Sequence, residues 1–448
     1  MKEIIVLANN EQDIVSTLLF AKKHCLDFAV SSGGHFFGDA NSSEGVVIDL
    51  RDFSAVEVDP QSKTLKAQGG AKWFAIDKAA SEHGLAAVAG GAQTGIGGVT
   101  LGGGYGLLTG AHGLALDNLL AARVVLADGR VVNASESENE DLFWALRGAG
   151  PSFGIVVEFT FKLHDQKKDV WAGALGFPLP KAVEIFRFAG SAIPTGNGRA
   201  TMTVLLCNPP PAFKPIFVVS IFYNGPASSA KDFFKPLYDL GPLFDGTKEM
   251  PYHVANGLAK QPPVPSTRRV MYGAIFPSSF SPDSFQDIID GYVNFITGVP
   301  TGTTAVIAWE FHDLSRILAV PDSVTSFPNR GNYRNVMIQA GWKGQDLDQM
   351  CRDWVLGVGG KFRAGFQSHG ISETGSHGGT GYYTNYDSKP KSSSYTRLRW
   401  RNTSIILTSA NLSHRLHHFC FEGIWSSLRQ TCRVESEVRP RQCFCQVV

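Results

Sequence analysis

The chain of 448 residues has little charge and no long apolar run. Charged residues make up 18% of it, and 41 Lys and Arg almost balance 40 Asp and Glu. A chain without a basic excess has no electrostatic footprint for nucleic acid or for an anionic membrane surface. Its longest apolar runs, such as 216–222, are strand-sized, whereas a membrane span needs roughly 20 residues. We therefore expect no nucleic acid and no membrane among its partners.

Cysteine is scarce, and the N-terminus has no visible secretion signal. The seven Cys are scattered, four of them in the last thirty residues, and no spacing matches a disulfide framework or a zinc site. The first ten residues hold one Lys and no apolar stretch of signal-peptide length. We expect no metal site, and the localisation stays open.

Glycine is the residue in excess, with 48 copies, many of them between 90 and 113. Short strands and helices alternate over 1–165, which includes a helix over 71–83 and a hairpin around Asp128-Gly129. Over 166–370 the pattern predicts an antiparallel sheet with helices on one face. With a hydrophobic fraction of 43%, the chain can fill more than one core.

The first chemistry-bearing stretch is a strand that runs into a glycine turn ending in His35. Glycines at 33 and 34 let consecutive backbone amides face an anion such as a pyrophosphate. In isolation, a plain polar turn explains Gly-Gly-His better.

The second stretch, 90–106, is the densest in glycine. Its GxGxxG-like spacings are weak evidence alone, because a dinucleotide fingerprint needs a strand before and a helix after, and the glycines are too dense for a helix N-terminus. A flexible linker is the alternative, but Val99, Leu101 and Tyr105 are poor linker residues. A backbone that passes close to a large planar cofactor explains the density better.

The third stretch, 141–156, takes a helix through a glycine loop into a buried strand. Ordinary helix–strand packing explains it when it is read alone. Together, however, the three stretches follow one order: Gly-Gly-His, then TGIGGVTLGGGYG, then GLALDNLLAARVVLADGR, then DLFWALRGAGPSFGIV. In this order they resemble the FAD-linked oxidases of the berberine bridge enzyme-like family, which have a vanillyl-alcohol-oxidase type of flavin domain.

The resemblance implies an α+β fold in three parts. A PCMH-type FAD-binding domain of two α/β subdomains is expected over 1–165. A substrate domain, an antiparallel sheet covered by helices, is expected over 166–370. The C-terminal segment 371–448 is family-like to about 387 and then diverges: from 391 it holds one Gly, no Asp and eight Arg.

The resemblance also assigns the cofactor site. It implies FAD bound covalently through His35, and a single link, because Gly91 stands where some relatives have a second, Cys-based one. Thr94 falls near the residue that governs oxygen access in the family. The implied cofactor-binding residues are Ser31, Ser32, Gly33, Gly34, His35, Thr94, Gly95, Gly97, Gly98, Gly103, Gly104, Gly154 and Ile155.

The implied catalytic residues are Tyr383, Tyr105 and Asn335. The family carries an acid or amide on a strand facing the flavin, and here that residue is Asn335, with Met337 and Gln339 on the same face. No acid stands on this strand, which counts against a carboxylate base. Tyr383 is the base candidate, but a free phenol with a pKa of about 10 needs help from a neighbour. The alternative is that the tyrosines are packing aromatics.

The resulting prediction is an FAD-dependent oxidoreductase that oxidises a small alcohol, sugar or amine by hydride transfer. Molecular oxygen is the expected acceptor, with hydrogen peroxide as product. The alternative is a flavin-binding protein with little or no turnover, since the family's pattern stops near Asp387. A divergent tail and a shifted reading frame both fit the segment beyond it.

Overall fold

The computed structural model describes residues 4–35, 41–88, 90–166, 168–258, 268–368, 383–386 and 445–446. Some sequence predictions lie outside these residues. They concern Asp387 and the divergent segment from 391, apart from 445–446.

The N-terminal part, residues 4–166, contains two main sheets. The first is parallel, in the order β1-β3-β2-β19, and α1 packs its apolar side on it. The second is antiparallel, in the order β4-β5-β9-β7-β8. The strands of the two sheets are β1 (Ile4–Leu7), β2 (Phe28–Ser31), β3 (Val46–Asp49), β19 (Cys445–Gln446), β4 (Val56–Asp59), β5 (Thr64–Gln68), β9 (Ile155–Lys162), β7 (Leu119–Val125) and β8 (Val131–Ser135).

Helices on both sheets complete the core of this part. The predicted Asp-Gly hairpin is confirmed as β7–β8, whose turn places Gly129 at a φ of +86°. The remaining elements are α1 (Glu11–Lys23), α2 (Trp73–Ser81), β6 (Leu85–Ala86), α3 (Ile96–Leu101), α4 (Thr109–His112), η2 (Ala115–Asn118), α5 (Glu140–Ala149), η3 (Gly150–Ser152) and β10 (His164–Asp165).

The glycine-rich stretch differs from the prediction in one respect, because it contains the helix α3. The prediction that these glycines are too dense for a helix N-terminus is wrong. Ile96, Thr100 and Leu101 are buried, so tertiary packing of one face outweighs the low helix propensity of Gly97 and Gly98.

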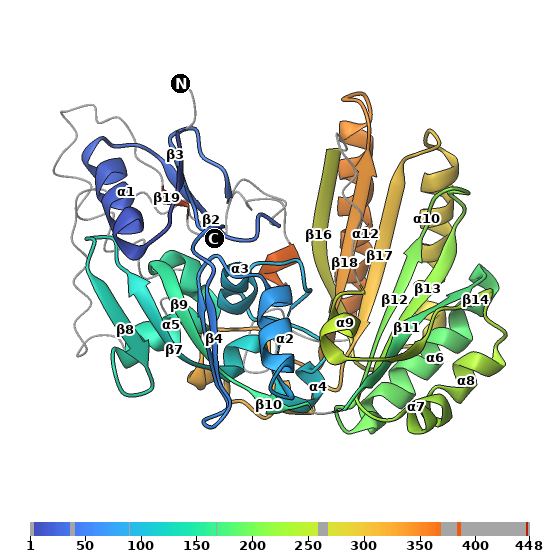
Figure 1. The fold of residues 1–448 in the computed structure, drawn as a ribbon. Coiled ribbons are helices and arrows are strands. Elements are labelled where there is room, and N and C mark those ends of the chain that lie inside the picture. Colours follow the sequence, from blue (N-terminus) through green and yellow to red (C-terminus); the bar gives the residue numbers. More distant parts are fainter. Residues whose placement is uncertain are drawn as a thin grey trace.

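The second part is built on one sheet of eight strands, antiparallel as predicted (Figure 1). Its order is β14-β11-β13-β12-β17-β18-β16, and β15 also pairs with β11. The strands are β11 (Val170–Phe177), β12 (Ala200–Cys207), β13 (Ile216–Tyr223), β14 (Phe244–Asp245), β15 (Lys248–Met250), β16 (Arg268–Pro277), β17 (Thr304–Phe311) and β18 (Tyr333–Trp342).

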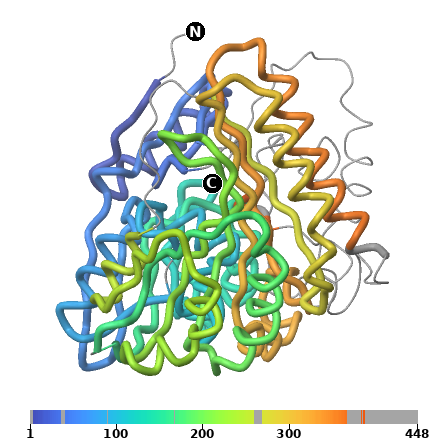
Figure 2. The backbone as a smooth tube through the Cα atoms, turned by 90° about the vertical axis from the view of Figure 1, so that its right-hand side faces the viewer, coloured from blue at the N-terminus to red at the C-terminus, as the bar shows by residue number. Residues whose placement is uncertain are grey.

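Helices cover one face of this sheet, and Figure 2 shows α10 and α12, yellow and orange, running along it. Val336 and Ile338 of β18 pack under these helices, so Asn335 and Met337 face the other way, as the strand alternation predicted. The helical elements of this part are η4 (Leu179–Lys181), α6 (Ala182–Ala192), η5 (Ile193–Gly196), α7 (Ala227–Phe233), α8 (Lys235–Asp239), α9 (Tyr252–Asn256), η6 (Pro282–Phe285), α10 (Gln286–Thr297), α11 (Ser315–Leu318), η7 (Asp322–Val324), α12 (Asp348–Ser368) and η8 (Thr384–Tyr386).

The two parts meet at several contacts, and the chain has the predicted α+β architecture. Helix α9 packs on α2, and α11 packs on α4. Arg330 of the second part forms an ion pair of 2.6 Å with Asp117, and both side chains are buried. Within the described ranges, no helix has the length and apolar character that crossing a membrane requires.

Candidate flavin and substrate site

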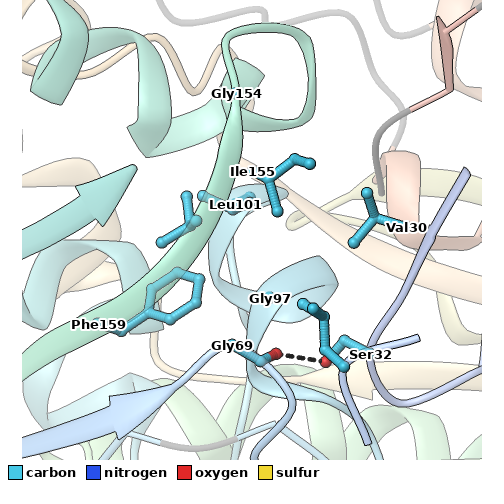
Figure 3. A pocket seen from close by; sticks show the side chains of 10 residues that line it. Val30, Ser32, Gly69, Gly97, Leu101, Gly154, Ile155 and Phe159 are labelled. Carbon is cyan, nitrogen blue, oxygen red and sulfur yellow. Dashed lines mark hydrogen bonds between the residues drawn. The ribbon is translucent and has the colours of Figure 1, made fainter. Parts of the chain in front are cut away.

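A pocket lined by glycines, Ser32 and apolar side chains lies between the two sheets of the N-terminal part (Figure 3). Ser32 follows β2 and donates a hydrogen bond of 2.7 Å to the carbonyl of Gly69. Gly97 comes from α3, and Gly154 and Ile155 lie at the start of β9. Four predicted cofactor residues, Ser32, Gly97, Gly154 and Ile155, thus come together around one space.

The glycines of this pocket differ in why they lack a side chain. At Gly154 the φ is +157°, and a Cβ would lie 2.6 Å from Val124, so the protein itself requires glycine. At Gly97 a Cβ would meet nothing closer than 4.0 Å, at Phe159. A Cβ there would therefore point into free space of the pocket, which fits a site shaped for a bound group.

The Gly-Gly-His turn lies directly against the glycine-rich stretch. A Cβ on Gly33 would lie 2.1 Å from the backbone nitrogen of Gly95, so the two backbones touch. His35 is exposed and hydrogen-bonds the backbone of Gln93. Partial burial and the nearby Lys72 lower its pKa, which favours the neutral, nucleophilic imidazole.

Backbone donors in this turn are left unused by the described part of the chain. Among the described residues, the backbone N–H groups of Gly33, Gly34 and His35 have no hydrogen-bond acceptor. Successive free amides in a glycine turn form a cradle for an anion. Such a cradle fits the pyrophosphate of FAD.

The predicted catalytic tyrosines form a cluster at the far end of α3. Tyr383 is buried, its hydroxyl oxygen accepts hydrogen bonds from the Gly104 N–H (3.2 Å) and from Asn385 (2.8 Å), and its ring packs edge-on to Tyr105 at 5.1 Å. Asn335 hydrogen-bonds Tyr105. The structure therefore brings Tyr105, Asn335 and Tyr383 together.

Gly103 and Gly104, predicted to bind cofactor, are explained in part by protein packing. Their φ angles are +126° and +88°, and a Cβ would lie 2.7 Å from Phe327 or 2.4 Å from Ala115. These glycines let the chain turn tightly beneath Tyr383. Of the other predicted cofactor residues, Ser31 ends β2, Thr94 and Gly95 precede α3, and Gly98 lies within it.

An acid that the sequence did not predict for the site lies on the neighbouring strand. Glu310 of β17 lies beside Asn335 and hydrogen-bonds it, and it also accepts a hydrogen bond of 2.5 Å from the Tyr386 hydroxyl. Its second oxygen, Oε2, is buried and has no hydrogen-bond partner among the residues that the structure describes. The signal was present: in TAVIAWEF, Glu310 is the one charge in an apolar strand, which is costly unless it serves a site.

Burial tunes the acids and phenols of this cluster in different ways. Burial raises the pKa of Glu310 to about 7, although Tyr386 and Asn335 donate to it. Burial also raises the pKa of Tyr383 to about 12, although Asn385 and Gly104 donate to it. Glu310 is thus the group that can exchange a proton near neutral pH.

An unpaired histidine and an unpaired amide border this cluster. His312 packs against Tyr105 at 5.7 Å, and burial lowers its pKa to about 3. Gln339 lies on the same face of β18 as Asn335. Within the described ranges, His312 Nδ1 and Gln339 Oε1 are buried and have no hydrogen-bond partner. Both groups can donate to or accept from a polar substrate.

Comparison with known proteins identifies an FAD-binding domain in the N-terminal part of the chain. Residues 3–135 match the family model described as an FAD binding domain. The FAD-linked oxidoreductase pgmH of Aspergillus terreus is 45% identical over 245 residues, which cover 54% of this chain and 50% of pgmH. The chain thus spans about half the length of this curated relative.

A second relative aligns over more of its length and shows the family. The FAD-linked oxidoreductase hasG of Aspergillus fumigatus is 32% identical over 377 residues, covering 78% of this chain and 76% of hasG. The chain belongs to the FAD-linked oxidoreductases.

Solved structures share the fold. The 6-hydroxy-D-nicotine oxidase of Arthrobacter nicotinovorans has a TM-score of 0.70 at 22% sequence identity. The match covers 86% of this chain and 83% of the oxidase. The BBE-like 1 protein of Physcomitrella patens has a TM-score of 0.71 at 20% sequence identity. That match covers 85% of this chain and 82% of the BBE-like 1 chain. These likenesses confirm the expected fold of the berberine bridge enzyme-like oxidases.

Proposed function

We propose that this protein oxidises a small organic substrate, an alcohol, sugar or amine, with FAD bound covalently at His35 and molecular oxygen as acceptor. The observation that carries the proposal is the alignment of two sites along α3. The pocket is lined by both Gly97 and Leu101 of α3, and the cluster of Tyr105, Tyr383 and Glu310 lies beyond the C-terminal end of that helix.

The residues of the N-terminal part would hold the cofactor. The amides of Gly33, Gly34 and His35 would bind the pyrophosphate, and the space beside Gly97 would take part of its body. FAD supplies the two-electron acceptor for hydride transfer. Gly91 has no side chain to form a second link, so attachment at His35 is single.

The residues of the cluster would handle the proton. We infer that Glu310, with its pKa near 7, accepts the proton of the substrate's hydroxyl or amine as the carbon loses hydride. Asn335 orients Glu310 and Tyr105, and Tyr386 donates to the same carboxylate. Tyr383, whose pKa is about 12, is then a hydrogen-bonding wall of the site and not its base.

The test starts with the colour of the purified protein. A yellow chain whose flavin absorbance stays with the protein after acid precipitation supports the covalent cofactor. His35→Ala is expected to release the flavin into the supernatant, while His83→Ala, at the exposed end of α2, keeps it bound. A colourless wild type, or colour retained in the His35 variant, contradicts the proposal.

Turnover is tested with a substrate panel. Peroxide release with alcohols, sugars or amines is expected, and it separates oxygen from another acceptor. Flavin that is bleached by a substrate without peroxide indicates a dehydrogenase. Bound flavin that no substrate in the panel reduces favours the non-catalytic alternative.

A further inference from the structure

Residues 90–95 form a turn, here called the 90–95 turn, that is held by α2. The Thr94 hydroxyl and backbone N–H both donate to the Gly91 carbonyl, at 2.5 and 2.8 Å. The first turn of α2 gives its free donors to the same segment: Trp73 N–H to Thr94 and Phe74 N–H to Ala92. Carbonyl groups of the turn thus accept hydrogen bonds from the first N–H groups of α2, and these bonds hold the turn in one position.

One side of the 90–95 turn touches the proposed flavin attachment. Gly95 contacts the backbone of Gly33, and Gln93 hydrogen-bonds His35. Any displacement of the turn would therefore move the surroundings of His35.

The other side is reached by a side chain of the second part. Asn256, at the end of α9, donates one hydrogen bond of 3.0 Å to the Gly90 carbonyl and another of 2.7 Å to Asp77 of α2. All three residues are buried. Both N–H groups of the Asn256 amide are used, so its orientation is fixed by these two acceptors.

Packing alone does not explain an acid at position 77. Trp73, Ile76 and Ala80 share its face of α2 and are apolar and buried. Asp77 Oδ1 has no hydrogen-bond partner in the described part of the chain, and burial raises the pKa of this carboxyl to about 7. An acid is costly at such a place, and its one hydrogen bond among the described residues is the one that orients Asn256.

We propose that Asn256 is a positioning residue through which the second part fixes the 90–95 turn and thereby the environment of the flavin. Asp77 orients the Asn256 amide, and the amide holds Gly90. The inference rests on the proposed function, since it takes His35 as the site of the flavin. It makes the flavin's electronic properties depend on a residue that touches neither cofactor nor substrate.

The test is spectroscopic and needs no substrate. Asn256→Leu removes both donors at similar volume. Tyr252→Phe on the same helix removes a buried hydroxyl that has no hydrogen-bond partner among the described residues. In the full-length protein with bound flavin, Asn256→Leu is expected to keep the flavin content, shift the flavin absorption maxima and visible circular dichroism, and change the reduction midpoint. Tyr252→Phe is expected to match wild type in all four.

Each outcome decides the question. If Asn256→Leu lowers only the melting temperature and leaves spectrum and midpoint as in wild type, the contact is merely structural and the inference is wrong. If that variant does not accumulate, Asn256→Asp, which keeps the volume, is read by the same criteria. A colourless wild type overturns the proposed function and this inference with it, whereas a yellow wild type with spectrally silent variants overturns the inference alone.

Discussion

Single residues decide which group can move a proton in this site. Tyr383 has the position that the family resemblance assigns to a base, but burial raises its pKa to about 12. Glu310 lies one strand from Asn335, and the same burial brings its pKa to about 7. Desolvation disfavours the charged form of both groups. It therefore keeps the phenol protonated near neutral pH and brings the pKa of the carboxyl into the neutral range.

Glu310→Gln tests this assignment through the pH profile. In wild type, kcat/KM should rise with pH to a plateau above about 7, because the ionised carboxylate is the active form. The variant should lack this limb and lose about 10²- to 10⁴-fold in kcat, since general-base catalysis contributes that much. Glu249→Gln, an exposed acid on β15, is the control. A Glu310 variant that keeps the limb assigns the base elsewhere.

The ion pair between Arg330 and Asp117 is the second residue-scale prediction. Arg330 is 1% exposed and also donates to Thr325 and to the Ile317 carbonyl. Asp117→Ala leaves that buried charge without its partner and should cost about 3–5 kcal/mol in the free energy of unfolding, measured with denaturant. The exposed pair of Lys235 and Asp239 is the control.

Loss of that exposed pair, in Asp239→Ala, should cost less than about 1 kcal/mol. Equal losses at the two pairs would show that Arg330 is solvated when Asp117 is removed.

At the scale of elements, the register of β17 and β18 builds the catalytic face. Trp309 pairs with Val336, so Glu310 and Asn335 become neighbours on the face away from the helices. Helix α5 enters its glycine loop through a kink at Arg147 and Gly148 and meets the second part there. Glycine is required at such a kink, because its backbone lies outside the region open to other residues.

Gly148→Ala and Gly357→Ala should have opposite effects on stability. Gly148 has a φ of +136°, and a Cβ would lie 2.3 Å from the Phe327 nitrogen, so the variant should lose roughly 2–4 kcal/mol. Gly357 is exposed within α12 with no atom within 4 Å of a Cβ, so alanine should add about 0.5–1 kcal/mol. Thermal melting of both variants measures this, and a neutral Gly148 variant would mean that the kink relaxes.

At the scale of the whole molecule, buried acids link folding to pH. Asp77 has an ordinary pKa of 3.8 and a folded pKa of about 7. The folded chain therefore holds a proton that the unfolded chain releases, and this contribution is complete below about pH 4 and lost as the pH rises to about 7. His164 and His312, whose pKa values fall to about 3, act in the opposite direction as the pH drops.

Asp77→Asn tests the contribution of Asp77 to the pH dependence of stability. Its free energy of unfolding, relative to wild type, should grow by up to about 1.4 kcal/mol per pH unit between pH 4 and 7, since the neutral amide has no proton to lose. Denaturant titrations at several pH values measure the difference. Asp287→Asn, an exposed carboxyl in the first turn of α10, should run parallel to wild type, and a parallel Asp77 curve would show that this carboxyl ionises freely.

From the sequence by itself came the fold class and the flavin-binding part, through the resemblance of its ordered glycine-containing stretches to a known family. The same resemblance proposes Tyr105, Asn335 and Tyr383 as catalytic residues. The glycine turn before His35 and the dense glycine stretch are local signals, because each places its residues by short-range geometry. The sequence could not predict that Glu310 lies beside Tyr386, 76 residues away in the chain, or that Asn256 hydrogen-bonds Asp77, 179 residues away. Strand register and the packing of α9 on α2 decide those contacts. Both depend on burying apolar faces across the whole molecule, so only the tertiary structure could bring these polar groups together.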